Sequence, residues 1–470
     1  SILNYNTRLL YVKIKFRNLI CYMKLCKLFV LVMITCSNML VLGQSKYEVN
    51  TRNGVDKIPF QLINNVIVIP VEINGVKRSF LLDTGVSRPI LFNFLKGTDT
   101  IPILHAEKIF LKGLGNDGRV EALSSSFNTF KVGNTVNLEQ TFYIVFDSSV
   151  DFAPKLGVPI HGILGSDFFK DLIVEINYAK QYLKVTTSER YKKKKCKRCE
   201  TFELQFYNEK PYLEASVTIN KKTIPVKLLI DSGSSDALWL FENEPAGLFV
   251  GDYYFRDILG YGLSGSVHGK RSKIDAVTFN DLIILHPKVA FPDPSYIKDL
   301  VKIEDRKGSI GGELLKRFNC VFNYKEHTIT LKPNGHYKTP FSYNKSGLTV
   351  ENSGLRIITE LHSKLQYATH SVIDINNSLQ VKAISVTENK LLLKTAFTIT
   401  QVRWDSPAYY AGLKSGDIII LLNGIDTRTY SLQELMSKFY QNKGKKIKLE
   451  VDREGQCQQQ AFRTVEVAAV

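Results

Sequence analysis

An internal repeat constrains the fold of this chain more than any other feature of its sequence. The segments at 66–87 and 212–235 run in step, because each has an alternating apolar strand, a turn at Ile-Asn, a second strand and a loop of small residues with one Asp. The two loop residues, Asp83 and Asp231, are 148 residues apart. Self-similarity at a fixed period predicts repeated structural units, so we expect two copies of one β-rich lobe.

Further landmarks keep this period to within two residues over more than 90 positions. Chance does not explain that agreement, whereas duplication of a lobe does. The matched pairs are GLGNDG (113–118) with GYGLSG (260–265), 147 residues apart, and, each 146 residues apart, GILGSDFFK (162–170) with GSIGGELLK (308–316) and Asn177-Tyr178 with Asn323-Tyr324.

Each Asp loop alone predicts little, because an Asp before small residues is commonly a turn cap. Two loops related by a pseudo-twofold axis would instead bring two carboxylates face to face. Like charges a few ångströms apart cannot both ionise, so such a pair shares one proton. The ionised Asp can then take a proton from water while the protonated Asp donates to a peptide carbonyl. Thr84 and Ser232 would hydrogen-bond between the loops, and Gly85 and Gly233 would let the loops touch.

These motifs resemble the bilobal pepsin-like and retropepsin-like aspartic proteases. The resemblance rests on LLDTGVS (81–87), LIDSGSS (229–235), ILG (163–165) and SIGG (309–312), and it covers residues 57–335. It implies two β lobes around a cleft for a polypeptide substrate, with Asp83 and Asp231 as the catalytic dyad and with no cofactor. It also implies that the loops are supported by Gly165 and Gly311 and that flap hairpins carry Gly113, Gly115, Gly260, Tyr261 and Gly262.

The sequence departs from that family pattern at three places. Val86 stands where the family often has Ser or Ala, and Ser309 makes the second supporting signal less apolar. The first hairpin lacks the Tyr that is usual in pepsin-like flaps, while Tyr261 lies in the second. We therefore expect flaps of the glycine-rich retropepsin type.

The C-terminal region has a different pattern. Ser406-Pro407 predicts a short helix that ends at Gly412. Ser431 and Glu434 form a capping box that opens an amphipathic helix ending near Gly444. The segment SPAYYAGLKSGDIIILLNG (406–424) resembles bacterial PDZ domains.

This second resemblance implies a small α+β domain, placed at 346–466, that binds a peptide or a protein C-terminus as an added strand. Gly347-Leu348 is the candidate carboxylate-binding loop. The alternative is a domain that only packs against the two lobes. The stretch 355–395 is longer than such a domain needs and has no assignment from sequence.

The positive charge does not indicate a nucleic-acid partner. The formal net charge is +17, but residues 1–43 carry six Lys or Arg and no acid, and the run at 191–198 carries six more. The rest of the chain therefore has a net charge of +5. We interpret 191–200 as a basic, solvated linker between the lobes.

The N-terminal segment, 1–43, is interpreted as an upstream stretch followed by a secretory signal. Lys24 and Lys27 precede an apolar run from Leu28 to Leu42, and Gly43 follows it. We expect export to the periplasm, the cell surface or the medium. The alternatives are an uncleaved membrane anchor and lipidation at Cys36.

The cysteines leave three alternatives open. Cys196 and Cys199 can form a local disulfide, remain as thiols or bind zinc, but zinc needs two more ligands and none is nearby. We therefore expect no metal site, and the sequence also lacks the HExxH and Gly-x-Ser-x-Gly motifs of other hydrolases.

Together, these features predict a mostly β protein with lobes at 57–190 and 201–335, related by a pseudo-twofold axis, followed by a PDZ-like domain. The predicted activity is that of an exported aspartic endopeptidase. A catalytically inactive peptide-binding scaffold is the rival, and a membrane-attached scaffold is a third alternative.

Overall fold

The computed structural model describes residues 46–92, 100–115, 118–147, 150–193, 195–300, 303, 305–367, 372–373, 379–380, 383–441 and 443–463. Residues 47–470 belong to one compact unit. No helix within the described ranges has the length and apolar character needed to span a membrane. The predicted secretory signal and the lipidation site at Cys36 lie outside the described residues.

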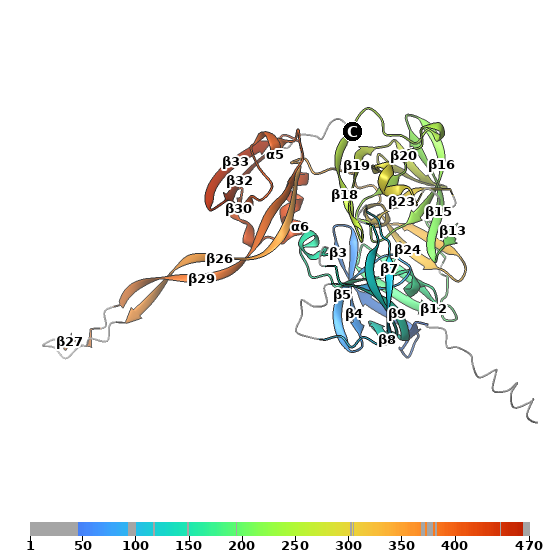
Figure 1. Cartoon of the computed structure of the whole chain (residues 1–470), viewed down its shortest axis with the longest axis horizontal. Helices are drawn as coiled ribbons and strands as arrows, with labels where there is room; N and C mark the ends of the chain where they lie inside the picture. Colours follow the sequence, from blue (N-terminus) through green and yellow to red (C-terminus); the bar gives the residue numbers. More distant parts are fainter. Residues whose placement is uncertain are drawn as a thin grey trace, which may run out of the picture. The chain divides into compact units, whose positions relative to one another are not determined.

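The first lobe is built on a mostly antiparallel sheet whose strands lie in blue and teal in Figure 1. Its central strands, β4 and β5, form a hairpin whose buried positions are filled by Val, Ile, Phe and Leu. The strand order is β1 (Glu48–Val49), β9 (Thr135–Val145), β6 (Ile90–Leu91), β10 (Gly162–Leu164), β5 (Val76–Leu82), β4 (Val66–Ile73), β8 (Val120–Val132) and β7 (Ala106–Leu111), with β3 (Gln61–Ile63) paired to β4.

The second lobe repeats this arrangement. In lobe 1, β10 lies parallel to β5 and antiparallel to β6, and in lobe 2, β23 lies parallel to β16 and antiparallel to β17. The strand order is β18 (Phe255–Gly262), β19 (Gly265–Lys273), β22 (Lys288–Pro292), β17 (Leu238–Leu240), β23 (Arg306–Ile310), β16 (Lys222–Ile230), β15 (Lys210–Ile219), β20 (Ala276–Phe279) and β21 (Leu282–Leu285), with β14 (Gln205–Tyr207) paired to β15.

A third sheet joins the two lobes and contains the pseudo-twofold axis. Its order is β13 (Glu200–Glu203), β25 (Thr328–Pro333), β24 (Phe318–Asn323), β11 (Leu172–Asn177), β12 (Tyr182–Thr187) and β2 (Val55–Pro59). At its centre Glu175 pairs with Val321, the residue 146 positions later that corresponds to it in the repeat. One hydrophobic core continues through this sheet into both lobes, and Phe169 contacts Phe322 and Tyr324 there. The prediction of two β lobes related by a pseudo-twofold axis is confirmed.

Short helices lie in the connections between strands in both lobes. They are α2 (Ala153–Leu156), η2 (Ser166–Phe169), η3 (Glu244–Ala246), α3 (Pro294–Ile297) and α4 (Gly312–Leu315).

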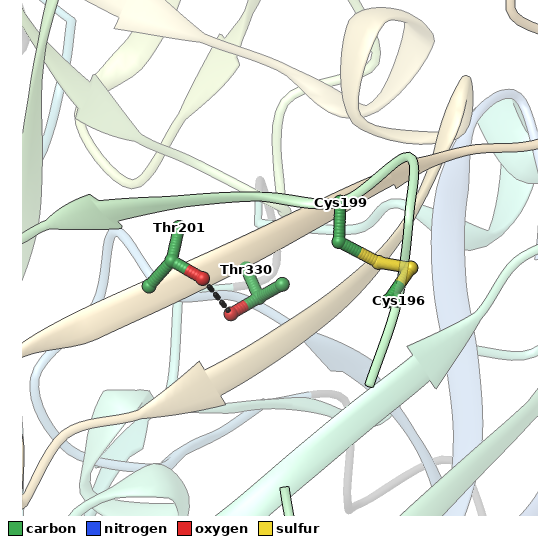
Figure 2. The surroundings of a disulfide bond; sticks show 4 residues. All are labelled: Cys196, Cys199, Thr201 and Thr330. Carbon is green, nitrogen blue, oxygen red and sulfur yellow. Dashed lines mark hydrogen bonds between the residues drawn. A yellow bond between two sulfur atoms is a disulfide. The ribbon is translucent and has the colours of Figure 1, made fainter. Parts of the chain in front are cut away.

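A local disulfide precedes β13. Cys196 and Cys199 are bonded to each other in the connection between the lobes, as Figure 2 shows. Two residues further on, the hydroxyls of Thr201 on β13 and Thr330 on β25 lie 2.9 Å apart (Figure 2). Of the three alternatives that the sequence left open for these cysteines, the structure has the disulfide.

The C-terminal domain has its own sheet and core. The sheet order is β26 (Leu348–Tyr367), β29 (Ala383–Val402), β30 (Ile418–Leu422), β32 (Lys446–Arg453) and β33 (Gln456–Arg463), with β31 (Ile425–Asp426) paired to β30. The helical segments are α5 (Pro407–Tyr410), η4 (Thr427–Thr429), α6 (Leu432–Ser437) and η5 (Lys438–Tyr440).

The helix boundaries predicted for this domain are partly right. Both bonds of the Ser431–Glu434 capping box are present at the start of α6. The predicted end near Gly444 is wrong, because α6 ends at Ser437 and a short 3₁₀ turn buries Phe439 in the core before the chain becomes extended at Gln441.

The stretch that sequence left unassigned forms a long two-stranded ribbon. Strands β26 and β29 pair along almost their whole length, and Figure 1 shows them extending well beyond the sheet of their own domain. The short pair β27 (Val372–Ile373) and β28 (Leu379–Gln380) lies between them in the chain.

Candidate active site

The two candidate catalytic acids occupy equivalent places in the two lobes. Asp83 follows the last residue of β5, and its backbone N–H donates to the carbonyl of Leu164 at 2.9 Å. Asp231 follows the last residue of β16, and its backbone N–H donates to the carbonyl of Ile310 at 2.9 Å. Each acid is therefore fixed by the supporting strand of its own lobe.

Hydroxyl groups lock the two Asp loops to each other. The Thr84 hydroxyl donates to the Ile230 carbonyl at 2.6 Å and accepts from the Ser232 N–H at 3.1 Å. The Ser232 hydroxyl reciprocates: it donates to the Leu82 carbonyl at 2.9 Å and accepts from the Thr84 N–H at 3.1 Å. Both side chains are fully buried, so these four bonds are shielded from water and hold the loops in one geometry.

The glycines of the loops leave room for the carboxyl groups. A Cβ atom on Gly233 would lie 2.3 Å from the Cγ atom of Asp83, and one on Gly85 would lie 3.2 Å from the Cγ atom of Asp231. Each glycine therefore lies against the acid of the other lobe. The carboxylates also accept bonds within their own loops, from the Gly85 N–H to Asp83 at 2.7 Å and from the Ser234 N–H to Asp231 at 3.1 Å.

The supporting glycines lie directly beneath the loops. A Cβ atom on Gly165 would be 2.7 Å from the Val86 carbonyl oxygen, and one on Gly311 would be 2.2 Å from the Asp236 carbonyl oxygen. Only a residue without a side chain fits such close backbone approaches. Sequence reasoning therefore identified positions that the packing restricts to glycine.

The electrostatics of the pair are not symmetric. Burial raises the pKa of Asp83 above the ordinary range, and the charge of Asp231 raises it further. Burial also raises the pKa of Asp231, but Arg306 and Lys210 oppose that rise by stabilising its anion. The negative charge of Asp231 thus favours a state in which Asp83 holds a proton. Asp83 is therefore the acid that keeps the proton, and Asp231 is the acid that ionises first.

The glycine-rich hairpins of the two lobes meet tip to tip. Gly115 and Ser264 form a parallel backbone bridge, and the Ser264 N–H donates to the Leu114 carbonyl at 3.1 Å. A Cβ atom on Gly115 would lie 1.8 Å from the Ser264 carbonyl oxygen, and one on Gly262 would lie 2.0 Å from that of Leu114. Both glycines are therefore required for this contact.

The other predicted flap residues have different surroundings. A Cβ atom on Gly113 would lie 2.5 Å from the Cβ atom of Leu263, whereas one on Gly260 would have its nearest neighbour 3.9 Å away. Tyr261 lies beside the cavity, and its ring is 4.1 Å from the Lys155 ammonium. Gly260 is thus the flap glycine with the most room for a side chain among those named from the sequence.

A cavity of about 1160 Å³ lies between the dyad and the hairpin tips. Asp83 and Asp231 line it, together with residues of both hairpins. The C-terminal domain contributes to the same wall through Leu348, Thr349, Val350, Glu351, Arg403, Met436 and Tyr440. The PDZ-like domain therefore borders the space that holds the two acids.

Sequence reasoning missed three residues at this site. Ser264 links the tips, since its hydroxyl accepts from the Gly113 N–H at 3.2 Å and donates to the Gly118 carbonyl at 2.8 Å. Lys210 and Arg306 line the cavity and act on the charge of Asp231. The repeat carried a signal for Arg306, which stands 146 positions after the apolar Ile160.

The candidate carboxylate-binding loop of the C-terminal domain is folded around its own side chain. The Asn344 amide oxygen accepts from the N–H groups of Ser346 at 2.9 Å and Gly347 at 3.3 Å. The Leu348 N–H donates to the Ser346 hydroxyl at 3.1 Å. A ligand carboxylate at Gly347-Leu348 would have to displace the Asn344 oxygen, so this role stays a prediction.

Lobe 1 also contacts the helix that borders β26. The Asn64 N–H donates to the Gln433 side chain of α6 at 3.1 Å. A Cβ atom on Gly157, which follows α2, would lie 2.7 Å from the Cβ atom of Leu432. The domain thus packs on lobe 1.

The described residues bring together no group of three or more His, Cys, Asp or Glu side chains that could hold a metal ion.

Two family models match parts of this chain. Residues 69–168 match a family model described as aspartyl protease, and residues 398–453 match one described as PDZ domain. A stretch of 64 residues is 42% identical to a Lactococcus lactis protein named as a zinc metalloprotease, and it spans 14% of this chain and 14% of that protein. The chain therefore carries an aspartyl protease domain and, at its C-terminus, a PDZ domain.

Proposed function

We propose that this protein is an aspartic endopeptidase in which Asp83 and Asp231 activate water for the hydrolysis of peptide bonds. The observation that carries the proposal is the placement of two half-buried carboxyl groups beside each other at the floor of one cavity, where the charge of Asp231 raises the pKa of Asp83. A pair in that state can act as base and acid in the same step.

The asymmetry of the pair assigns a role to each acid. Asp231, as the ionised member, accepts a proton from the attacking water. Asp83, as the protonated member, donates its proton to the oxygen of the scissile carbonyl, so the tetrahedral intermediate forms without a covalent bond to the enzyme. Collapse of that intermediate releases the amine with a proton returned from the dyad.

The surrounding residues hold this geometry. Thr84 and Ser232 keep the two carboxyl groups at a fixed separation, and pre-fixed orientation is a large part of catalysis by such groups. The hairpin tips close the cavity above the substrate and exclude water other than the nucleophile.

The test is cleavage of a denatured protein by the purified chain and by Asp83→Asn and Asp231→Asn variants. Both variants should lose activity by about 10²–10⁴-fold, while their circular dichroism and unfolding midpoints show that they still fold. Full activity in Asp231→Asn would contradict the mechanism and would favour the rival hypothesis of a peptide-binding scaffold. A matched control is Asp305→Asn, which changes an exposed Asp that does not line the cavity.

Export of the enzyme is part of the proposal. It is supported by the charge, apolar run and small-residue exit at residues 23–43. Expression of the full chain with fractionation and N-terminal sequencing of the mature protein tests it: a new N-terminus near Gln44 supports cleavage, and retention of the intact segment in the membrane fraction supports an anchor.

A further inference from the structure

The wall of the cavity differs between the two lobes at one matched position. Strand β15 begins at Lys210 after a two-residue turn, Asn208-Glu209, and β4 begins at Val66 after the turn Asn64-Asn65. All four turn residues have positive φ, between 46° and 70°. Lys210 pairs with Tyr207 just as Val66 pairs with Ile63. The two positions are structurally equivalent, so a cation in lobe 2 replaces an apolar side chain in lobe 1.

A second cation stands nearby in lobe 2 and is held in place. Arg306, the first residue of β23, lies 146 positions after Ile160, which is buried in lobe 1. The Nε atom of Arg306 donates to the Gly308 carbonyl at 3.1 Å, and its guanidinium lies 5.3 Å from the Phe241 ring. These contacts fix the guanidinium but supply no negative charge.

Lys210 differs from Arg271 and Lys288, two other cations of the cavity, because it lacks an ion-pair partner among the described residues. Arg271 is paired with Asp236 and Asp257, and Lys288 is paired with Glu313. Across the described residues, no carboxylate forms an ion pair with Lys210. The half-buried ammonium group therefore borders the dyad with unused hydrogen-bonding capacity.

An ammonium group in this position is costly unless an anion joins it. Burial lowers the pKa of Lys210, and the charges of Asp83 and Asp231 only partly offset that effect. A carboxylate brought by the substrate would supply the missing hydrogen bonds and the missing charge.

We propose that Lys210, with Arg306 behind it, forms a subsite that binds the carboxylate of an acidic substrate side chain next to the scissile bond. The preferred substrates are then polypeptides with Asp or Glu on the lobe 2 side of the dyad. The matched position in lobe 1, Val66, accepts an apolar side chain instead. This inference rests on the proposed endopeptidase function and names its substrate class.

The experiment compares pairs of quenched-fluorescent peptides that differ only by Glu or Gln at one position flanking the cleaved bond. The wild type should cleave the Glu member of one pair with a kcat/KM about 10- to 100-fold higher, the range expected for a hydrogen bond to a charged group. Lys210→Met should abolish that preference mainly by lowering kcat/KM for the Glu peptide. Lys210→Arg should retain most of the preference.

Two controls separate this role from an effect on the dyad alone. Lys298→Met removes an exposed cation of the same cavity. In this variant, the ratio of kcat/KM for the Glu peptide to kcat/KM for the Gln peptide should stay unchanged. If Lys210→Met instead lowers kcat/KM equally for both peptides and shifts the pH profile, Lys210 only tunes the dyad and the proposal is overturned. An unchanged preference in Lys210→Met also overturns it.

A binding measurement distinguishes failure of this proposal from failure of the proposed function. Asp83→Asn replaces the protonated acid with a neutral isostere, so peptide affinity can be measured by calorimetry without turnover. The Glu peptide should bind more tightly than the Gln peptide, and Lys210→Met in the Asp83→Asn background should remove the difference. Equal affinities for the two peptides would overturn the subsite even if cleavage by the wild type is observed. A clear difference without cleavage would support the subsite and contradict the endopeptidase function.

Discussion

The two lobes are alike at the floor of the cavity, which is formed by the two Asp loops, and they differ at its walls. On the floor, Thr84 and Ser232 make the same pair of bonds in opposite directions, with lengths that agree to within 0.3 Å. On the walls, Lys210 faces the cavity where lobe 1 has Val66. The floor residues contact each other across the axis, so a change in one copy disturbs both. The wall residues contact the cavity, so each copy is free to diverge.

The largest expected effect on activity comes from adding a side chain at a glycine of the Asp loops. Gly233→Ala would place a Cβ atom 2.3 Å from Asp83, and displacement of a catalytic group by about 1 Å can cost about 100-fold in rate. We expect kcat/KM to fall at least that far. Gly251→Ala is the control, because its Cβ atom would meet nothing within 4 Å and should leave kcat/KM within about twofold. Activity near wild type in Gly233→Ala would show that the floor is less rigid than its contacts indicate.

A smaller effect is expected at the hairpin tips. Gly115→Ala and Gly262→Ala would each place a Cβ atom 2.0 Å or less from a carbonyl oxygen of the other tip. Closure should be impaired from either side, with kcat/KM reduced by about 10-fold in both, the scale of a 1.4 kcal/mol change in barrier. The unfolding midpoints should stay close to wild type, because the tips contribute little to the core. A loss in one variant alone would show that a single flap controls closure.

The hydroxyl bonds of the floor predict matched losses of stability. Thr84→Ala and Ser232→Ala each leave buried backbone groups without a partner, which costs about 1–3 kcal/mol in the free energy of unfolding. Urea denaturation should give similar values, apart from about 0.8 kcal/mol for the methyl group of Thr84. A difference well above that amount would mean that the hydroxyl bonds of Thr84 and Ser232 contribute unequally to the free energy of unfolding.

The smallest effect is a pH-dependent shift in stability. The pKa of Asp83 is raised in the folded state, so the stability that its protonation confers is complete below the ordinary Asp pKa and is lost as pH rises through the raised value. Asp83→Asn has no such loss. Its Tm should therefore exceed that of the wild type by an amount that grows with pH, on the order of 2 °C. A constant difference from acid to alkaline pH would contradict the pKa assignment.

The same raised pKa predicts the pH dependence of the rate. The active state holds one proton on the pair, so kcat/KM should fall as pH rises and Asp83 loses that proton. A rate that increases steadily into the alkaline range would argue against the dyad.

The sequence was most informative where the chain repeats itself. The positions of Asp83, Asp231, Gly165 and Gly311 could be predicted because both copies needed the same backbone approach. The meeting of the hairpins at Ser264 could not, since a Ser in a Gly-rich turn has many ordinary roles. Lys210 was missed because a single Lys at the start of a strand reads like any solvated side chain, and only its position over the dyad gives it significance.

The C-terminal domain shows a different limit. The capping box at Ser431 and Glu434 was predictable because its chemistry is local. The ribbon of β26 and β29 was not, because its exposed positions include Leu355, Ile357 and Leu393, each more than 60% exposed. Apolar residues in that pattern ordinarily indicate burial. The exposure of this part of the two strands could therefore not be predicted from the sequence.

The contacts between the Asp loops and the contacts between the hairpin tips together limit how a substrate can enter the cavity. Hydroxyl bonds close the ring beneath the dyad, and the bridge between Gly115 and Ser264 closes it overhead. A long polypeptide that enters the cavity from the side would do so after the bridge between the tips has parted. Under the proposed endopeptidase function, each turnover would begin with the opening of this bridge, and a more viscous solvent should lower kcat if that opening limits the rate.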